Sequence, residues 1–274
     1  MKLTNPIWRL REGRELVLST PLVVGAVNYT DTSFVEETRN YSLEETVQRI
    51  TEHLRDGADI IDIGAESTKP SALPICPIEE EEKLCSVLRS LQESKINSIF
   101  SIDTYKASVA RAVLEYSCDI INDITGFEYD TGLVDVLCEY KPGYVLTFTT
   151  RYSGNRTPTI DDMMRYFEQK LSFLVQKGFP EEHIVLDIGV GFGYTYPYTV
   201  EIIRNIRNLY CFNRPLYLGI SHKTWYQEST QLSYREKECA TGITTALLAS
   251  IAHIHRVHNV ALAKRALYIA SHLA

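Results

Sequence analysis

Residues 98–124 read SIFSIDTYKASVARAVLEYSCDIINDI and contain a strand pattern, a helical pattern and a second strand pattern. Residues 98–104 and 118–124 carry apolar side chains on both faces, which is typical of parallel strands that are covered on both sides. Residues 105–117 between them space their apolar side chains by three and four, which indicates a helix. This stretch therefore predicts two parallel strands joined by a helix.

The same alternation extends along the chain. The other strand patterns occupy residues 21–29, 58–65, 143–150, 183–189, 215–221 and 253–260. The other helical patterns occupy residues 42–57, 77–94, 130–141, 160–178, 197–209, 239–252 and 261–274. A strand followed by a helix, repeated eight times, predicts an α/β protein with the (β/α)₈ TIM-barrel fold.

The alternative is a doubly wound open sheet, but no GxGxxG turn follows an early strand. We find no linker or low-complexity segment, so residues 1–274 are expected to form a single barrel domain. Residues 1–20 are expected to be a lead-in arm or hairpin that covers the bottom of the barrel.

The composition bears on partners and compartment. With 35 acidic against 28 basic side chains, the net charge is −7, which argues against binding to nucleic acid or to an anionic membrane. The sequence shows no signal-peptide pattern and no apolar run long enough to span a membrane. The six cysteines form no CxxC pair, so we expect reduced thiols and a cytoplasmic protein.

Polar residues end most of the predicted strands and would meet at one mouth of the barrel. Asp103, Asn122 and Asp187 offer two carboxylates and an amide, a set that suits a flat heterocycle carrying N–H donors. The alternative for Asp103 and Asn122 is that they only cap the loops that follow. Asp62 lies in mid-strand and is interpreted as structural. The sequence thus predicts a heterocycle site at the mouth.

A second group, Lys223, Arg256 and His258, comes from the last two strands, where barrels frequently hold phosphate. In an acidic protein this cationic group indicates a local anion site. In residues 253–258, Arg256 and His258 share one face of the strand, whereas His253 and His255 share the other. The HxHxxH pattern is therefore poor evidence for a zinc site, because a zinc site needs its ligands on one face of the strand.

At these residues the sequence resembles the dihydropteroate synthase family. The similar segments, in chain order, are GAVNYTDTSF (25–34), IIDIGAESTKP (60–70), residues 101–126, LDIGVGFGY (186–194), GISHK (219–223) and RVHNV (256–260). The SxK and RxH elements favour the synthases over the pterin methyltransferases, which share the barrel.

The resemblance implies a fold, a reaction and a set of site residues. Family members join 6-hydroxymethyl-7,8-dihydropterin diphosphate to 4-aminobenzoate and release diphosphate. They use Mg²⁺ as cofactor and form homodimers. Asp103, Asn122 and Asp187 would hold the pterin ring, and Lys223 would contact its polar edge. Asn28 would place Mg²⁺ and the diphosphate together with Arg256 and His258. The implied loop residues for diphosphate and aminobenzoate are Phe34, Thr68 and Lys69, and Lys69 joins Lys223, Arg256 and His258 in the predicted catalytic set.

The departures from the family pattern concentrate in the loops after the first two strands. Asp31-Thr32 replaces Pro-Asp, residues 36–38 replace Asp-Gly-Gly, and Lys69 replaces arginine. Elsewhere, the family's Met-His is absent from residues 143–150, and the other changed positions are Tyr194, His222 and Asn259. Three hypotheses follow: a divergent synthase, a paralogue that uses another amine acceptor, or a pterin-binding protein without turnover.

Overall fold

The computed structural model describes residues 6–29, 42–66, 74–154, 157–223 and 232–273. Its centre is a closed barrel of eight parallel strands, as the sequence predicts, so the open-sheet alternative is wrong. In barrel order the strands are β3 (Leu22–Asn28), β4 (Ile60–Gly64), β5 (Phe100–Asp103), β6 (Ile120–Asp123), β7 (Gly143–Thr147), β8 (Ile184–Asp187), β9 (Leu216–Leu218) and β10 (Ile254–Val257).

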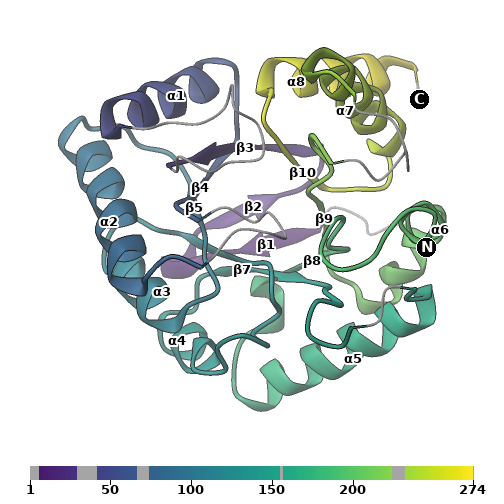
Figure 1. The fold of residues 1–274 in the computed structure, drawn as a ribbon, viewed down its shortest axis with the longest axis horizontal. Helices are drawn as coiled ribbons and strands as arrows, with labels where there is room; N and C mark the ends of the chain where they lie inside the picture. Colours follow the sequence, from purple (N-terminus) through teal and green to yellow (C-terminus); the bar gives the residue numbers. More distant parts are fainter. Residues whose placement is uncertain (1–5, 30–41, 67–73, 155–156, 224–231, 274) are drawn as a thin grey trace.

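Helices form the outer ring (Figure 1). They are α1 (Leu43–Arg55), α2 (Pro77–Glu93), α3 (Ala107–Leu114), α4 (Leu133–Tyr140), α5 (Ile160–Gln176), α6 (Tyr198–Asn205), α7 (Tyr234–Leu248) and α8 (Val260–Leu273), with short 3₁₀ helices at Arg11–Gly13, Glu181–His183 and Ile206–Phe212. Helix α7 starts earlier than the predicted residue 239, because Ser233 and Glu236 form a capping box ahead of the apolar stretch. None of the described helices has the length and apolar character needed to cross a membrane.

Strand alternation divides the barrel residues into two sets. Val24, Ile60, Val145 and Val185 point into the barrel and pack together, whereas their neighbours in sequence pack against the helices. Two residues further along several strands, toward their carboxyl ends, the inward positions become polar, as with Asp62 after Ile60. The apolar layer thus lies at the amino-terminal end, and the polar layer lies at the mouth.

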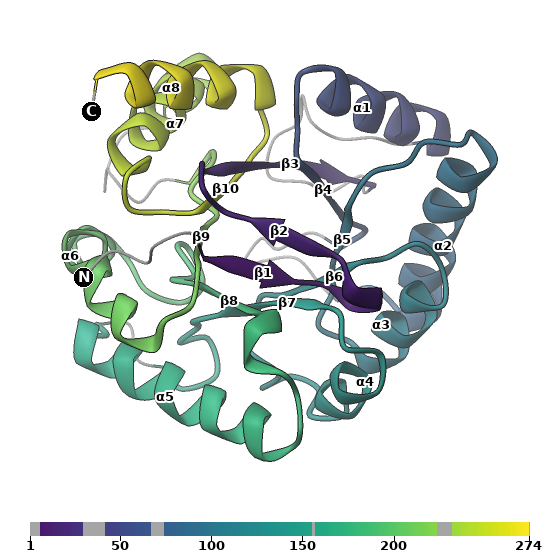
Figure 2. The same ribbon diagram turned by 180° about the vertical axis from the view of Figure 1, so that it is seen from behind.

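A two-stranded antiparallel hairpin, β1 (Ile7–Arg9) and β2 (Glu15–Val17), lies across the amino-terminal end of the barrel (Figure 2). Trp8 is fully buried in the inner apolar layer, and its indole Nε1–H donates to the carbonyl of His183 at 2.7 Å. The hairpin therefore supplies the apolar floor of the barrel, and the carboxyl-terminal end remains for a site.

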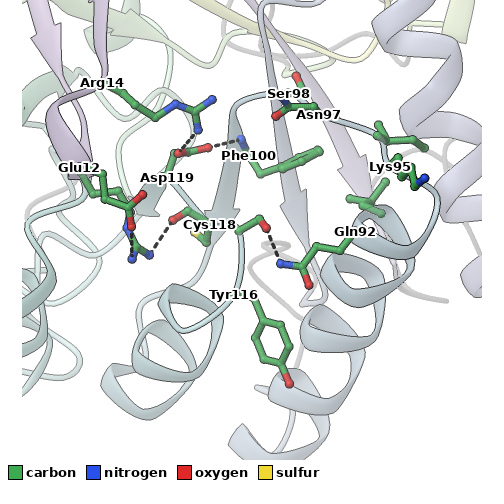
Figure 3. A pocket seen from close by; sticks show the side chains of 14 residues that line it. Glu12, Arg14, Gln92, Lys95, Asn97, Ser98, Phe100, Tyr116, Cys118 and Asp119 are labelled. Atoms are coloured by element: carbon green, nitrogen blue, oxygen red, sulfur yellow. Dashed lines mark hydrogen bonds and ion pairs between the residues drawn. The ribbon is translucent and has the colours of Figure 1, made fainter.

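A cavity of about 450 Å³ lies beside the hairpin turn, at the amino-terminal ends of β5 and β6 (Figure 3). Its polar walls tether the hairpin: Arg14 forms an ion pair with Asp119 at 2.5 Å, and Arg11 donates to the carbonyls of Leu114 and Cys118. Asp119 in turn accepts the backbone N–H of Phe100 at 3.1 Å. The cavity is thus on the opposite end of the barrel from the polar strand ends.

Candidate active site

The structure brings the three predicted acceptors together at the mouth. Asp103 ends β5 and is register partner to Asn122 in β6, while Asp187 ends β8. All three side chains are buried, with 9%, 3% and 4% of their surface exposed. They occupy inward positions of their strands, because each lies two residues beyond an inward apolar or small side chain. The mouth therefore presents buried hydrogen-bonding groups to its interior.

Asp187 and Lys223 both border the small space over Gly219. A Cβ at Gly219 would lie 3.6 Å from Asp187 Oδ2 and 3.8 Å from Lys223 Nζ. Burial raises the pKa of Asp187, and the charge of Lys223 opposes that shift. Burial lowers the pKa of Lys223 to about 8, with Asp187 acting in the opposite direction. Lys223 Nζ also donates to the carbonyl of Val190 and lies 4.2 Å from the ring centre of Phe192.

Arg256 lies among carboxylates. Its Nε donates to Asp62 at 2.5 Å and its Nη2 donates to Asp103 at 3.0 Å. Although burial works to lower the pKa of Arg256, these two carboxylates hold it above its ordinary value. Burial raises the pKa of Asp103 to about 7, and Arg256 opposes that shift. Arg256 is thus tied to the acceptor group through its hydrogen bond to Asp103.

Asp62 is the site residue that the sequence analysis missed. It is fully buried and accepts hydrogen bonds from Ser101 Oγ at 2.5 Å and from Asn122 Nδ2 at 3.0 Å, besides Arg256. Its place as an inward residue could have been found from strand alternation, because it follows inward Ile60 by two positions. Asp62 therefore orients both an acceptor and the cation of the site.

His258 shares the inward face of the strand end with Arg256 but has different partners. Its Nδ1 and its backbone N–H contact Ser221 Oγ at 3.0 and 3.2 Å. The His222 ring lies edge-on to it at 5.0 Å, and the other side of His222 is bonded to buried Glu238. Burial lowers the pKa of His258 well below its ordinary value, and Arg256 lowers it further. His258 is therefore a neutral imidazole near pH 7.

The other two histidines of this strand lie on the helix side. His253 Nδ1 accepts the backbone N–H of Leu216 at 3.0 Å, and His255 is fully buried. Within the described ranges, no three side chains of the His, Cys, Asp and Glu types are grouped as metal ligands. Asn28, at the end of β3, has its Oδ1 3.6 Å from the position of a Cβ at Gly64, and Asp103 Cβ is 3.4 Å from that position. Asn28 and Asp103 therefore both border the space over Gly64.

Two of the glycines in residues 187–194, Gly189 and Gly193, are required by close packing. A Cβ at Gly189 would lie 1.8 Å from the carbonyl oxygen of Phe148, and one at Gly193 would lie 2.5 Å from Thr150 Oγ1. Both residues also adopt positive φ angles, which glycine accepts without strain. Tyr194, which stands where the family pattern has lysine, is buried and donates its hydroxyl to the carbonyl of Ile188. This segment is thus a tightly packed turn over β7.

The remaining predicted residues, Phe34, Thr68 and Lys69, lie outside the described part of the chain, as do the changed loop positions 31–32 and 36–38. Within the described part, the site is a buried set of carboxylates and an amide with two cations and a neutral imidazole. Fold and site together define the class: a (β/α)₈-barrel enzyme with a polar small-molecule site at the carboxyl ends of its strands.

Comparison with known proteins gives the family. A family model described as pterin binding enzyme matches residues 24–258. A dihydropteroate synthase of Bacillus subtilis is 32% identical over 240 residues, which cover 87% of this chain and 84% of that protein. The solved structure of Xanthomonas albilineans dihydropteroate synthase with 4-aminobenzoic acid has 26% identity, a TM-score of 0.88 and 98% coverage of both chains. A Clostridium difficile dihydropteroate synthase structure in the presence of pteroic acid has 27% identity, a TM-score of 0.84 and coverage of 93% and 97%.

The chain belongs to the pterin-binding enzymes and, within them, to the dihydropteroate synthase family.

Proposed function

We propose that this protein is a transferase that condenses 6-hydroxymethyl-7,8-dihydropterin diphosphate with 4-aminobenzoate in folate biosynthesis. The observation that carries the proposal is the buried group of Asp103, Asn122 and Asp187 beside Lys223. Buried carboxylates and an amide that face the interior of a mouth are suited to the N–H groups of a pterin ring. The relatives named above support the same reaction.

In the proposed complex, the pterin ring binds at Asp103, Asn122 and Asp187. Asp62 and Arg256 hold two of these side chains in place. Arg256 keeps the Asp103 carboxylate oriented through its Nη2, and Asp62 keeps the Asn122 amide oriented through Oδ2. Preorganised partners of this kind lower the cost of binding, because few groups need to move. Lys223 covers the polar edge of the ring.

The reaction breaks the bond between the exocyclic methylene carbon and the diphosphate oxygen and forms a carbon–nitrogen bond with the amine. The amine nitrogen loses one proton, and diphosphate takes the electron pair of the broken bond. Arg256 and His258 share the inward face of the last strand end, and we assign the departing diphosphate to this side of the mouth. A neutral His258 donates one N–H to a phosphate oxygen without needing a charge. We assign Phe34, Thr68 and Lys69 to the aminobenzoate and diphosphate loops on the family resemblance alone.

Mg²⁺ is the cofactor that the family implies, and Asn28 fits it as a single protein ligand. Mg²⁺ prefers oxygen donors and commonly takes only one or two from the protein, with water and substrate phosphates completing its shell. The Asn28 amide oxygen, which borders the space over Gly64, is an oxygen donor of this kind. When bound, the ion neutralises charge on the diphosphate.

We further propose that the protein is a homodimer through the outer face of α7 and α8. These two helices pack against each other and leave large apolar side chains exposed. The side chains are Ile243, Leu247, Tyr268, Ile269 and Leu273, which are 55–82% exposed. Several large exposed apolar side chains on two helices that pack together are typical of a subunit interface. Sedimentation should give twice the chain mass for the parent and a lighter species for Leu247→Glu; a monomeric parent would refute the dimer.

We place the reaction in the cytoplasm. All six cysteines lie in the described part of the chain and none forms a disulfide. Free thiols, three of them exposed, are typical of a reducing compartment.

The test of the condensation is a purified-protein assay with the pterin diphosphate and Mg²⁺, with and without 4-aminobenzoate, in which mass spectrometry identifies the products. The parent protein is expected to form dihydropteroate. Lys223→Ala is expected to lose at least about a hundredfold in kcat/KM, whereas Lys177→Ala, an exposed control at the C-cap of α5, keeps the parent value. Diphosphate release with another amine only, or pterin binding without turnover, would favour one of the two other hypotheses and refute this one.

A further inference from the structure

Two buried hydroxyls in the barrel have no hydrogen-bond partner within the described residues. They are Thr147 Oγ1 and Tyr217 OH. Their residues are 0% and 1% exposed, so bulk water does not satisfy these groups in place of protein. An unpaired buried hydroxyl is costly, and such groups in folded proteins are usually paired with water or a ligand. Each of the two hydroxyls can therefore take a water or a ligand as its partner.

Both residues flank Asp187, which the proposed function assigns to the pterin ring. Strands β7, β8 and β9 lie side by side, and the register pairs Thr147 with Asp187 and Asp187 with Tyr217 (Figure 1). The three residues thus form one row across three adjacent strands. Thr147 and Tyr217 are therefore the direct neighbours of Asp187 on the two adjoining strands.

The row faces the interior of the barrel. Thr147 lies two positions beyond Val145, which belongs to the inner apolar layer, and Tyr217 belongs to that layer itself. The Tyr217 hydroxyl lies close to the site charges, since Asp62, Arg256 and Asp187 all affect its pKa. Burial is the largest cause of a pKa well above the ordinary value for Tyr217, so this hydroxyl stays protonated and can donate.

We propose that Thr147 and Tyr217 are specificity-determining residues whose hydroxyls hydrogen-bond the polar edge of the bound pterin on both sides of Asp187, directly or through one ordered water. The proposal rests on the proposed function, because it takes a pterin as the ligand of Asp187. A carboxylate between two hydroxyls offers acceptors and donors in one row, which matches a ring edge with alternating N–H and acceptor atoms. A less polar ring would leave both hydroxyls unpaired and would be rejected.

The test compares Thr147→Val and Tyr217→Phe, which remove only the hydroxyls, with Thr245→Val as the matched control. Thr245 is also fully buried with an unpartnered Oγ1, but it lies in helix α7 of the outer ring. Calorimetry with 6-hydroxymethylpterin is expected to give a roughly fivefold weaker Kd for each site variant and the parent Kd for the control. The KM for 4-aminobenzoate is expected to stay at the parent value in all three.

Thermal unfolding without ligand separates binding from a structural role. Neither hydroxyl has a protein partner to lose in the described structure, so the ligand-free Tm of both site variants should equal or exceed that of the parent. A Kd within twofold of the parent in either variant would overturn the proposal, as would a weaker Kd accompanied by a lower ligand-free Tm. If the parent itself does not bind 6-hydroxymethylpterin, the proposed function fails first, and that result is distinct from an unchanged Kd.

Discussion

Removing the Asp62 carboxylate should be among the most damaging single changes in this fold. Asp62 is 0% exposed and its carboxylate accepts three hydrogen bonds, from Ser101, Asn122 and Arg256, at 2.5, 3.0 and 2.5 Å. In Asp62→Ala the Arg256 side chain stays largely shielded, at 17% exposure, with Asp103 as its one remaining carboxylate in the described structure. Removing one member of a buried ion pair costs about 3–5 kcal/mol. For a chain of this size that corresponds to a fall in Tm of roughly 10 °C.

The assay is urea unfolding at 25 °C followed by circular dichroism, with Glu139→Ala as the control. Glu139 pairs with Arg111 at 2.7 Å, but the two side chains are 55% and 42% exposed. Exposed pairs contribute about 0–1 kcal/mol, so the control should remain close to the parent. If Asp62→Ala costs less than about 1 kcal/mol, like an exposed pair, then Asp62 is not the hub of this network.

Three further predictions follow from the site and the floor of the barrel. Because the pKa of Lys223 is lowered to about 8, kcat/KM for the pterin substrate should fall as pH rises through about 8. Lys223→Arg should move this decline to higher pH, and a kcat/KM that stays constant at alkaline pH would contradict the role of Lys223. The pKa of Asp103 in the fold, about 7, exceeds the unfolded value of about 3.9, so its contribution to stability is fully present below pH of about 4 and is lost as pH rises through about 7. The free energy of unfolding, measured across that pH range, should therefore decline less in Asp103→Asn than in the parent. The same pH dependence in both proteins would count against a raised pKa of Asp103. Trp8→Ala, which empties a fully buried position and loses the bond to His183, should cost about 3–5 kcal/mol in urea unfolding, and a cost below about 1 kcal/mol would show that the hairpin does not close the floor.

The barrel could be predicted because its signals are local. Each strand shows its apolar pattern within a few residues, and alternation alone places Asp103, Asn122 and Asp187 on the inward side. Helix α7 was predicted to start too late because its first turn, YREKE, is polar and carries no apolar period. Its capping residues Ser233 and Glu236 are the signal that defines the start.

The partners of Arg256 could not be predicted in the same way. Its bond to Asp62 joins residues 194 positions apart in sequence, and only closure of the barrel between β10 and β3 brings them together. Strand parity places Arg256 and His258 on one face, which is correct, but it does not identify their hydrogen-bond partners. Unpartnered groups such as Thr147 Oγ1 are likewise a property of packing, which no sequence pattern describes.

The central claim is that a pterin ring binds at Asp103, Asn122 and Asp187, and the most direct measurement is a crystal structure with 6-hydroxymethyl-7,8-dihydropterin diphosphate. We expect ring nitrogens within hydrogen-bond distance of all three side chains, with the diphosphate toward His258. A ring bound elsewhere, such as in the cavity beside Arg14 at the opposite end of the barrel, would rule out this pterin site.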